Sequence, residues 1–330
     1  MKRKTYKHLR PKRTLAVPSD EKGFVLVTIL LVIAILFPLV LAFTSRVQVN
    51  LLQAENFRNS VQAVRLSRSG IEGAIGILKT DDPAYDTLKD VWALDLPTLS
   101  LAEGRLEVKI KDEDGKIAVN QLVQKNGVDV NKDVELRLRS LISRLGGRAE
   151  VVDALIDWID TDDMVTGAAG AEYEHYKPLG YASKNGPIDS LDELSLVKGF
   201  DKELLVDKNL LNYLTVAQTD GKVNVNTASS EVLLALLGTQ TSALAQPLND
   251  SDIEELVRHR DEHEFRNIQD VNAVVKISTA QAGNIASLIK VNSAFFTVSS
   301  KCTIGRVVYN SEALLQRDGK NITTVSWREF

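Results

Sequence analysis

The hydrophobic pattern of the chain begins with an uncharged run and continues as an amphipathic stripe. Residues 24–43, FVLVTILLVIAILFPLVLAF, contain no charge, and as a helix they match the ~30 Å hydrocarbon core of a bilayer. Beyond them, apolar residues recur at three- and four-residue steps as far as Leu78, with one interruption near Ser67. The pattern predicts one helix of about 55 residues that begins in lipid and ends on a globular core.

Strand patterns occur on both sides of a long central region. Leu106, Val108 and Ile110 alternate with charged residues, as in a strand with one wet face, and residues 80–100 before them read as irregular. The runs FFTVSS, GRVVYN, EALLQ and ITTVSW follow within residues 295–327, and Asp318-Gly319 is a hairpin-turn pair. We expect an α+β fold in which the long helix packs on a small antiparallel sheet.

The central region, residues 114–292, is too long to be a loop and carries an internal repeat. DGKIAVN (114–120) matches DGKVNVN (220–226), and SLDELSLVKGF (190–200) matches NIQDVNAVVKI (267–277) at its apolar positions. Apolar spacing predicts helices at 231–237 and 253–263, the first preceded by cap-forming residues in Asn226-Thr227-Ala228-Ser229. The repeat predicts an inserted α-helical domain of two related units.

Charge is distributed unevenly. The first 23 residues hold eight Lys and Arg against two Asp and Glu, whereas the whole chain carries a net charge of −4. The positive-inside rule therefore leaves the N-terminus in the cytoplasm and places the body on the other side of the membrane. The remaining acidic body disfavours a nucleic-acid partner. Cys302 is the only cysteine, so an intrachain disulfide is excluded.

Three interpretations of the apolar run compete: a secretory signal, a plain anchor, and a prepilin-type signal. No convincing A-x-A-like site follows the run, whereas Lys22-Gly23-Phe24 opens it directly. With the long helix, this junction resembles the pilins and pseudopilins of type IV pili and type II secretion systems. The resemblance implies cleavage between Gly23 and Phe24 by a prepilin peptidase, with methylation of the mature protein. The fifth mature residue is Thr28, where the superfamily usually has Glu.

Five blocks in order resemble the general secretion pathway protein K family, the minor pseudopilins K of type II secretion systems. They are DGKIAVNQL, LIDWIDTDD, GAEYEHY, NGPIDSLDELSLVKGF and KVNVNTAS. The resemblance implies a non-enzymatic, single-pass inner-membrane protein with a periplasmic body, at the tip of the pseudopilus, where it helps to initiate and cap the filament. It implies as partners two smaller minor pseudopilins (I- and J-like), the major pseudopilin, the prepilin peptidase and the membrane. The expected segments are a leader (1–23), a transmembrane half-helix (24–43), the amphipathic helix with the first part of the pilin domain (44–113), the insertion (114–292) and the last strands (293–330).

An acidic cluster lies in residues 149–176, which contain no Lys or Arg. It can be a solvated helix face or a cation site. Crowding of carboxylates at a helix C-terminus opposes the helix dipole, and the small residues of 164–171 suit a loop around an ion. The family resemblance also implies calcium at this block. We therefore expect Ca²⁺ bound by carboxylates among Asp157, Asp160, Asp162, Asp163 and Glu172.

Two functions other than filament assembly also have sequence features in their favour: DNA uptake and zinc-dependent hydrolysis. The second repeat unit resembles helix-hairpin-helix modules, which would suit a minor pilin of a type IV pilus or DNA-uptake machine. Those modules bind phosphate through a Gly-hydrophobic-Gly hairpin. The stretch LLGTQTSALAQPL has only Gly238, and the other candidate, VKGFDKE, has Asp201 in place of the second glycine. His259 and His263 fit the H-x-x-E-H zinc pattern, yet the helix is charged and aligns with LIDWID. Nucleotide-binding and hydrolase motifs are absent. We expect no catalytic residues and no nucleic-acid partner.

Overall fold

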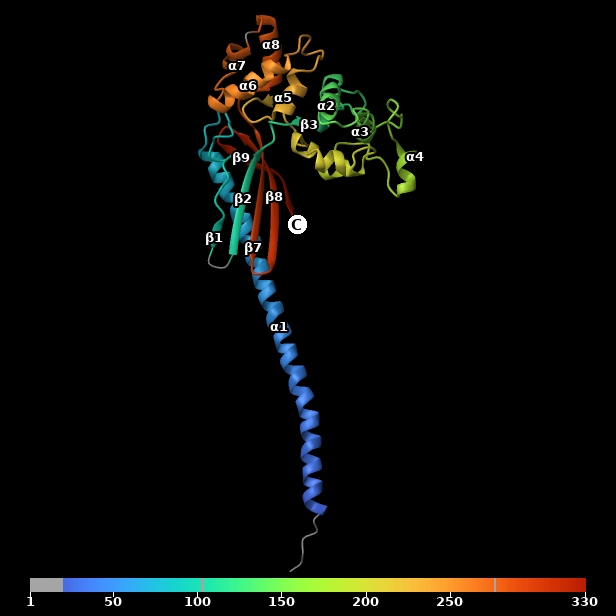
Figure 1. Cartoon of the computed structure of the whole chain (residues 1–330), viewed down its shortest axis with the longest axis vertical. Helices are drawn as coiled ribbons and strands as arrows, with labels where there is room; N and C mark the ends of the chain where they lie inside the picture. Colours follow the sequence, from blue (N-terminus) through green and yellow to red (C-terminus); the bar gives the residue numbers. More distant parts are fainter. Residues whose placement is uncertain (1–19, 102–103, 276) are drawn as a thin grey trace, which may run out of the picture. The chain divides into compact units, whose positions relative to one another are not determined.

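The computed structural model describes residues 20–101, 104–275 and 277–330 (Figure 1). Most of the expected leader, residues 1–23, lies outside the described residues. The chain divides into two compact units, residues 1–59 and 60–330.

Helix α1 (Asp20–Thr80, 61 residues) supplies the described part of the first unit. Its apolar side chains between Phe24 and Phe43 are exposed, and an 18-residue window of the helix has a mean hydropathy of 3.2. The helix is long and apolar enough to cross a membrane. The hydroxyl of Thr28 donates to the carbonyl of Phe24 (2.9 Å), so this side chain is satisfied within its own helix.

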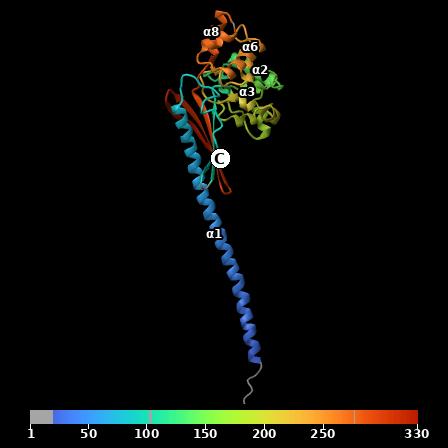
Figure 2. The same ribbon diagram turned by 60° about the vertical axis from the view of Figure 1, so that its left-hand side comes forward.

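In the second unit, the last part of α1 lies along a five-stranded antiparallel sheet (Figures 1 and 2). Ile71, Ala74 and Leu78 pack with Phe296 and other buried sheet residues, which confirms the predicted apolar stripe. Ser67, the interruption in that stripe, is fully buried and donates to the carbonyl of Ser300 (2.9 Å). A polar residue is tolerated there because the sheet supplies its hydrogen-bond partner.

The sheet has the order β1-β2-β7-β8-β9. Its strands are β1 (Leu99–Leu101), β2 (Gly104–Asp112), β7 (Phe295–Ile304), β8 (Val307–Asp318) and β9 (Asn321–Glu329). The predicted antiparallel sheet and hairpin are confirmed: β8 and β9 are joined through Gly319, whose φ is +58°.

The structure gives the strand boundaries that the runs left open. Residues 307–310 of GRVVYN and the run EALLQ belong to one strand, β8, which pairs continuously with β7, whereas Gly305 and Arg306 form the turn before it. The pattern seemed to break because Ser311 is polar, but this side chain is buried against Ser67. Residues 80–100 are not irregular throughout, since β1 pairs with β2 at the sheet edge. A three-residue strand is too short to show a periodic pattern.

The chain between β2 and β7 forms two successive helical halves, green to yellow and amber to orange in Figure 1. The first contains β3 (Ile117–Ala118), η1 (Val119–Gln121), α2 (Lys132–Arg144), α3 (Val151–Ile159), α4 (Tyr173–Tyr176), η2 (Lys177–Leu179), η3 (Leu191–Leu196), η4 (Glu203–Asp207), η5 (Leu210–Tyr213) and β4 (Leu214–Thr215). The second contains β5 (Val223–Asn224), α5 (Ser230–Leu237), α6 (Asp250–Glu262), α7 (Ile268–Val275), α8 (Thr279–Leu288) and β6 (Ile289–Lys290).

Each half opens at a copy of the repeated DGK block and closes by parallel strand pairing. Strand β3 pairs with β4, and β5 pairs with β6. The predicted helices at 231–237 and 253–263 correspond to α5 and α6, and Ser229 caps α5 by accepting from the Val232 N–H. Both halves share one hydrophobic core that is separate from the cores between α1 and the sheet.

Asp114 ties the point where the chain leaves the sheet to the point where it returns. Its Oδ2 accepts hydrogen bonds from the N–H groups of Ala294 (2.6 Å) and Phe295 (2.9 Å). Its carbonyl accepts from Asn224, and its carboxylate pairs with Lys290 (2.7 Å). One buried residue therefore contacts both connections of the insertion through its carboxylate and the second repeat block through its carbonyl.

Candidate metal centre

The candidate centre is built on helix α3, whose nine residues are all buried, and on the loop that follows it. Asp157 is fully buried and uses both carboxylate oxygens on this loop, accepting from the N–H groups of Thr166 (2.9 Å) and Ala171 (2.6 Å). Asp153 accepts from the Ala169 N–H (3.2 Å) in the same way. These two carboxylates hold the loop in shape by satisfying backbone donors that would otherwise be buried without partners.

Three further carboxylates converge at the end of α3. Asp160, Asp162 and Glu172 each present one oxygen, and these oxygens lie within 4.8 Å of one another. Asp160 is 3% exposed and Glu172 is 6% exposed. Oδ1 of Asp160 and Oε1 of Glu172 have no hydrogen-bond partner, while Oε2 of Glu172 accepts from Ser183 (3.0 Å). Two nearly buried acceptors are therefore left without a donor, which is costly unless something else contacts them.

The electrostatics of the cluster are unfavourable for ionised carboxylates. Burial, and then the charges of Asp162, Asp157 and Glu172, raise the pKa of Asp160 to about 7. Burial also raises the pKa of Glu172 to about 7, against the hydrogen bond from Ser183. Among the described residues, no Lys or Arg forms an ion pair with these three carboxylates. A bound cation would supply the missing positive charge.

Of the five residues expected at the acidic block, the structure brings together Asp160, Asp162 and Glu172. Asp157 holds the loop backbone, and Asp163 accepts a 3.4 Å hydrogen bond from Asn185. Ser183 was not predicted, because a serine eleven residues beyond Glu172 carries no sequence signal for the site.

The chemistry of the three carboxylates fits a hard cation. Oxygens that share one Ca²⁺ at about 2.4 Å can be up to about 4.8 Å apart, and Ca²⁺ accepts irregular carboxylate-rich sites more readily than Mg²⁺ does. The loop after α3 is fixed at Gly167, where φ is +58°, and at Gly170, where an added Cβ would lie 2.4 Å from Oδ2 of Asp157. The loop is thus preformed around the carboxylates.

The other motifs do not form comparable sites. His259 stacks on Phe265 (5.2 Å between ring centroids), and neither His259 nor His263 belongs to a metal-capable group in the described part of the chain. Gly238 ends α5 with φ −88°, and its N–H donates to the Leu234 carbonyl, so it does not form a phosphate-binding hairpin.

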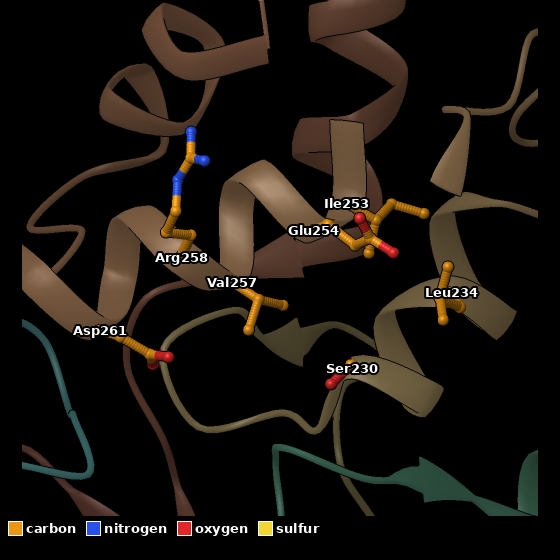
Figure 3. A pocket seen from close by; sticks show the side chains of 7 residues that line it. All are labelled: Ser230, Leu234, Ile253, Glu254, Val257, Arg258 and Asp261. Carbon is orange, nitrogen blue, oxygen red and sulfur yellow. The ribbon is translucent and has the colours of Figure 1, made fainter. Parts of the chain in front are cut away.

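A shallow pocket between α5 and α6 is mainly apolar (Figure 3). It is lined by Ser230, Leu234, Ile253, Glu254, Val257, Arg258 and Asp261. In Figure 3 the Arg258 side chain extends away from Ser230 and Leu234, so the polar groups do not converge on one point. The pocket lacks the grouped polar side chains of a catalytic or cofactor site.

The residues expected to act in processing and in the filament lie in the first unit. An added Cβ at Gly23 would meet no described atom within 4 Å, so the fold gives no packing reason for glycine at this position. Phe24 is 74% exposed. Thr28 is one turn further along the same helix, bonded to the Phe24 carbonyl.

Comparison with known proteins gives a consistent result. Two profiles of the family described as type II secretion system (T2SS), protein K, match residues 115–219 and 223–292, together more than half of the chain and close to its two repeat units. The type II secretion system protein K of Pseudomonas aeruginosa is 27% identical over 318 residues, covering 91% of this chain and 90% of the relative. The Klebsiella pneumoniae protein of the same name is 24% identical and covers 93% and 96%.

Among solved structures, the chain is similar in fold to one from the GspK-GspI-GspJ complex of the enterotoxigenic Escherichia coli type 2 secretion system. The TM-score is 0.67 at 18% identity, covering 84% of this chain and 99% of that chain. The similarity therefore extends over the pilin-like sheet as well as the inserted helical halves.

Proposed function

This chain belongs to the type II secretion system protein K family, and from that premise we propose that it is a minor pseudopilin that starts and caps the pseudopilus. The observation that carries the proposal is the combination of a family-specific insertion with a pilin-like helix and sheet. It is a structural assembly protein, without catalytic activity. The filament that it starts serves protein export across the outer membrane.

The proposed partners follow from the solved relative. That relative was crystallised with GspI and GspJ. We propose that this chain forms the equivalent complex with two smaller minor pseudopilins, with the major pseudopilin assembling behind them.

Thr28 supports a leading position. In pilin-like filaments the usual Glu at this place neutralises the N-terminal amine of the subunit ahead, because an unpaired charge in an apolar filament core costs several kcal/mol. A leading subunit has no such amine to meet. The hydroxyl of Thr28 is instead satisfied by the carbonyl of Phe24, so it needs no partner from another subunit.

The bulk of the insertion favours the same position. Residues 114–292 place about 180 residues between β2 and β7, where a small pilin domain needs only a short connection. Within a filament shaft, the inserted domain would clash with the subunits stacked above it. At the tip of the filament no subunit lies above, so the domain can be accommodated.

Processing and orientation complete the proposal. A prepilin peptidase cleaves between Gly23 and Phe24 at the cytoplasmic face, the mature protein is methylated, and residues 24–43 span the inner membrane with the body in the periplasm. The apolar helix and the basic leader support this orientation.

We further propose that Ca²⁺ binds Asp160, Asp162 and Glu172, with Asp157 and Asp163 adjacent. A ligand that binds only the folded state stabilises it by about 2.7 kcal/mol at a hundredfold excess over Kd. Chelator should therefore lower the Tm, and Asp162→Ala should abolish most of that response. Asp163→Ala is the matched control and should keep it. Equal melting curves with calcium and with chelator would mean that the cluster is a solvated acidic surface that binds no cation.

Assembly is tested by co-purification from membranes. The full-length chain, solubilised in detergent with its two candidate minor pseudopilins, should yield a complex containing all three. Recovery of this chain alone, under conditions in which the other two still associate, would contradict the proposed function.

A further inference from the structure

A second group of carboxylates lies in the connection between α1 and β1, in the sheet-containing part of the molecule. Asp81, Asp86 and Asp90 each offer one oxygen, and the three oxygens lie within 4.8 Å of one another. This separation is the upper limit for oxygens that share one Ca²⁺ at about 2.4 Å. The group uses none of the residues of the acidic loop after α3.

Asp86, a member of this group, has a carboxylate oxygen without a hydrogen-bond partner. Asp86 is fully buried, and its Oδ2 accepts hydrogen bonds from the Ser293 N–H (2.7 Å) and from the Arg317 side chain. Its Oδ1 has no hydrogen-bond partner. Because a buried carboxylate oxygen without a donor is unfavourable, this atom indicates a missing positively charged or donating group.

The positive charge present does not balance the group. Arg317 pairs with Asp81 (3.2 Å) and Asp86 and also donates to the Ser293 carbonyl (2.9 Å). Asp90 forms no ion pair with a described residue, and its oxygens accept from the N–H (2.7 Å) and hydroxyl (3.1 Å) of Thr87. Each carboxylate oxygen can accept more than one contact, so these bonds leave room for a cation.

The pKa directions agree with an excess of negative charge. Burial raises the pKa of Asp86 to about 6 despite the opposing effect of Arg317. Burial and then the charge of Asp90 raise the pKa of Asp81. Arg317 thus does not fully offset the effect of burial on the pKa values of Asp81 and Asp86.

We propose that Asp81, Asp86 and Asp90 form a second Ca²⁺ site, with Arg317 as a fixed neighbouring charge. The ion would hold together three points of the connection after α1, next to Arg317 in β8. Ca²⁺ is favoured over Mg²⁺ because Asp86 and Asp90 are already held by Ser293 and Thr87 and cannot rearrange into a regular octahedron. The affinity is lower than at the acidic loop, since Arg317 repels the ion.

Terbium luminescence in the full-length chain, in detergent, separates this site from the first. The Glu172→Gln background weakens the acidic-loop site. Trp92 is two residues from Asp90, so their Cα atoms lie within about 7.6 Å, close enough for Trp92 to sensitise bound Tb³⁺. We expect saturable emission that Ca²⁺ displaces, and Asp90→Asn in that background should weaken Tb³⁺ binding about tenfold or more.

The controls distinguish a lost ligand from a lost fold. Asn at position 90 keeps an oxygen that accepts from the Thr87 N–H. Asp95→Asn removes an exposed carboxylate of the same connection and should leave Tb³⁺ binding unchanged. Asp81→Asn is an independent second variant and should reproduce the loss with an unchanged circular dichroism spectrum. Identical titrations for Asp90→Asn, Asp81→Asn and Asp95→Asn would overturn the second site, whatever happens at the first.

Discussion

At the scale of single residues, the buried carboxylates in and after α3 have two different roles. Asp153 and Asp157 accept backbone N–H groups and shape a loop, whereas Asp160 and Glu172 keep oxygens without partners. The sequence predicted that the acidic block is special, because carboxylates crowd a helix C-terminus. It could not separate the two roles, since they depend on which loop amides turn toward which side chain.

Calcium stabilisation should grow with pH. The raised pKa values of Asp160 and Glu172, both about 7, mean that the ion-free folded chain binds more protons than the unfolded chain between about pH 4 and pH 7. These two groups therefore make the ion-free fold less stable as pH rises through that range. Ca²⁺ binds the ionised forms, so the Tm increase on adding Ca²⁺ should be larger at about pH 8 than at about pH 5.5.

Thermal unfolding at several pH values measures this linkage. The Asp163→Asn variant serves as the control and should show the same trend as the unmodified chain. An equal Tm increase at the two ends of the pH range would mean that Asp160 and Glu172 do not exchange protons for calcium.

Gly23 gives a second prediction at the residue scale. Since a side chain at this position meets no described atom, Gly23→Val should leave the fold intact while blocking the peptidase. The variant should accumulate as full-length precursor, whereas the unmodified protein should begin at Phe24 by mass spectrometry of the intact protein. A mature N-terminus near residue 44 would instead indicate a secretory signal.

At the scale of elements, the approach of α1 to the sheet depends on Gly70. A Cβ there would lie 2.4 Å from Ser300 Oγ and 2.9 Å from Val108 Cγ2. Glycine usually costs a helix about 0.5–1 kcal/mol relative to alanine, so its presence here is explained by close packing. The sequence pattern gave the apolar stripe but not this contact, which depends on where the strands lie.

Gly70→Ala should accordingly reduce the free energy of unfolding by about 1–3 kcal/mol, because helix and sheet must separate. Gly73 lies on the exposed side of the same helix, where an added Cβ meets no described atom. Gly73→Ala should stabilise the chain by about 0.5–1 kcal/mol. Denaturant unfolding of the two variants should give changes of opposite sign, and equal signs would contradict the packing argument.

Periodicity was sufficient for the elements that contain several repeats of their pattern. Helix α1, strand β2 and helices α5 and α6 were predicted in this way, and the repeated DGK blocks indicated two halves. The short strands β3, β4, β5 and β6 were missed, since two residues carry no period and their pairing joins segments far apart in the chain.

At the scale of the whole molecule, buried charged groups tie the sheet-containing region to the connections of the insertion. Asp114 contacts Ala294 and Phe295, and Arg317 contacts Asp86 and the Ser293 carbonyl. These partners are separated by up to 231 residues, so no local pattern could have identified them. A large insertion can then be carried on a small sheet without a flexible linker.

We propose that this chain occupies the end of the filament. The most direct measurement is the position of gold-labelled protein on isolated pseudopili viewed by electron microscopy. Thr28 and the insertion predict a single label at one tip, and Thr28→Glu should still be found there because a Glu is tolerated where nothing lies ahead. Label at regular intervals along the shaft would contradict the claim.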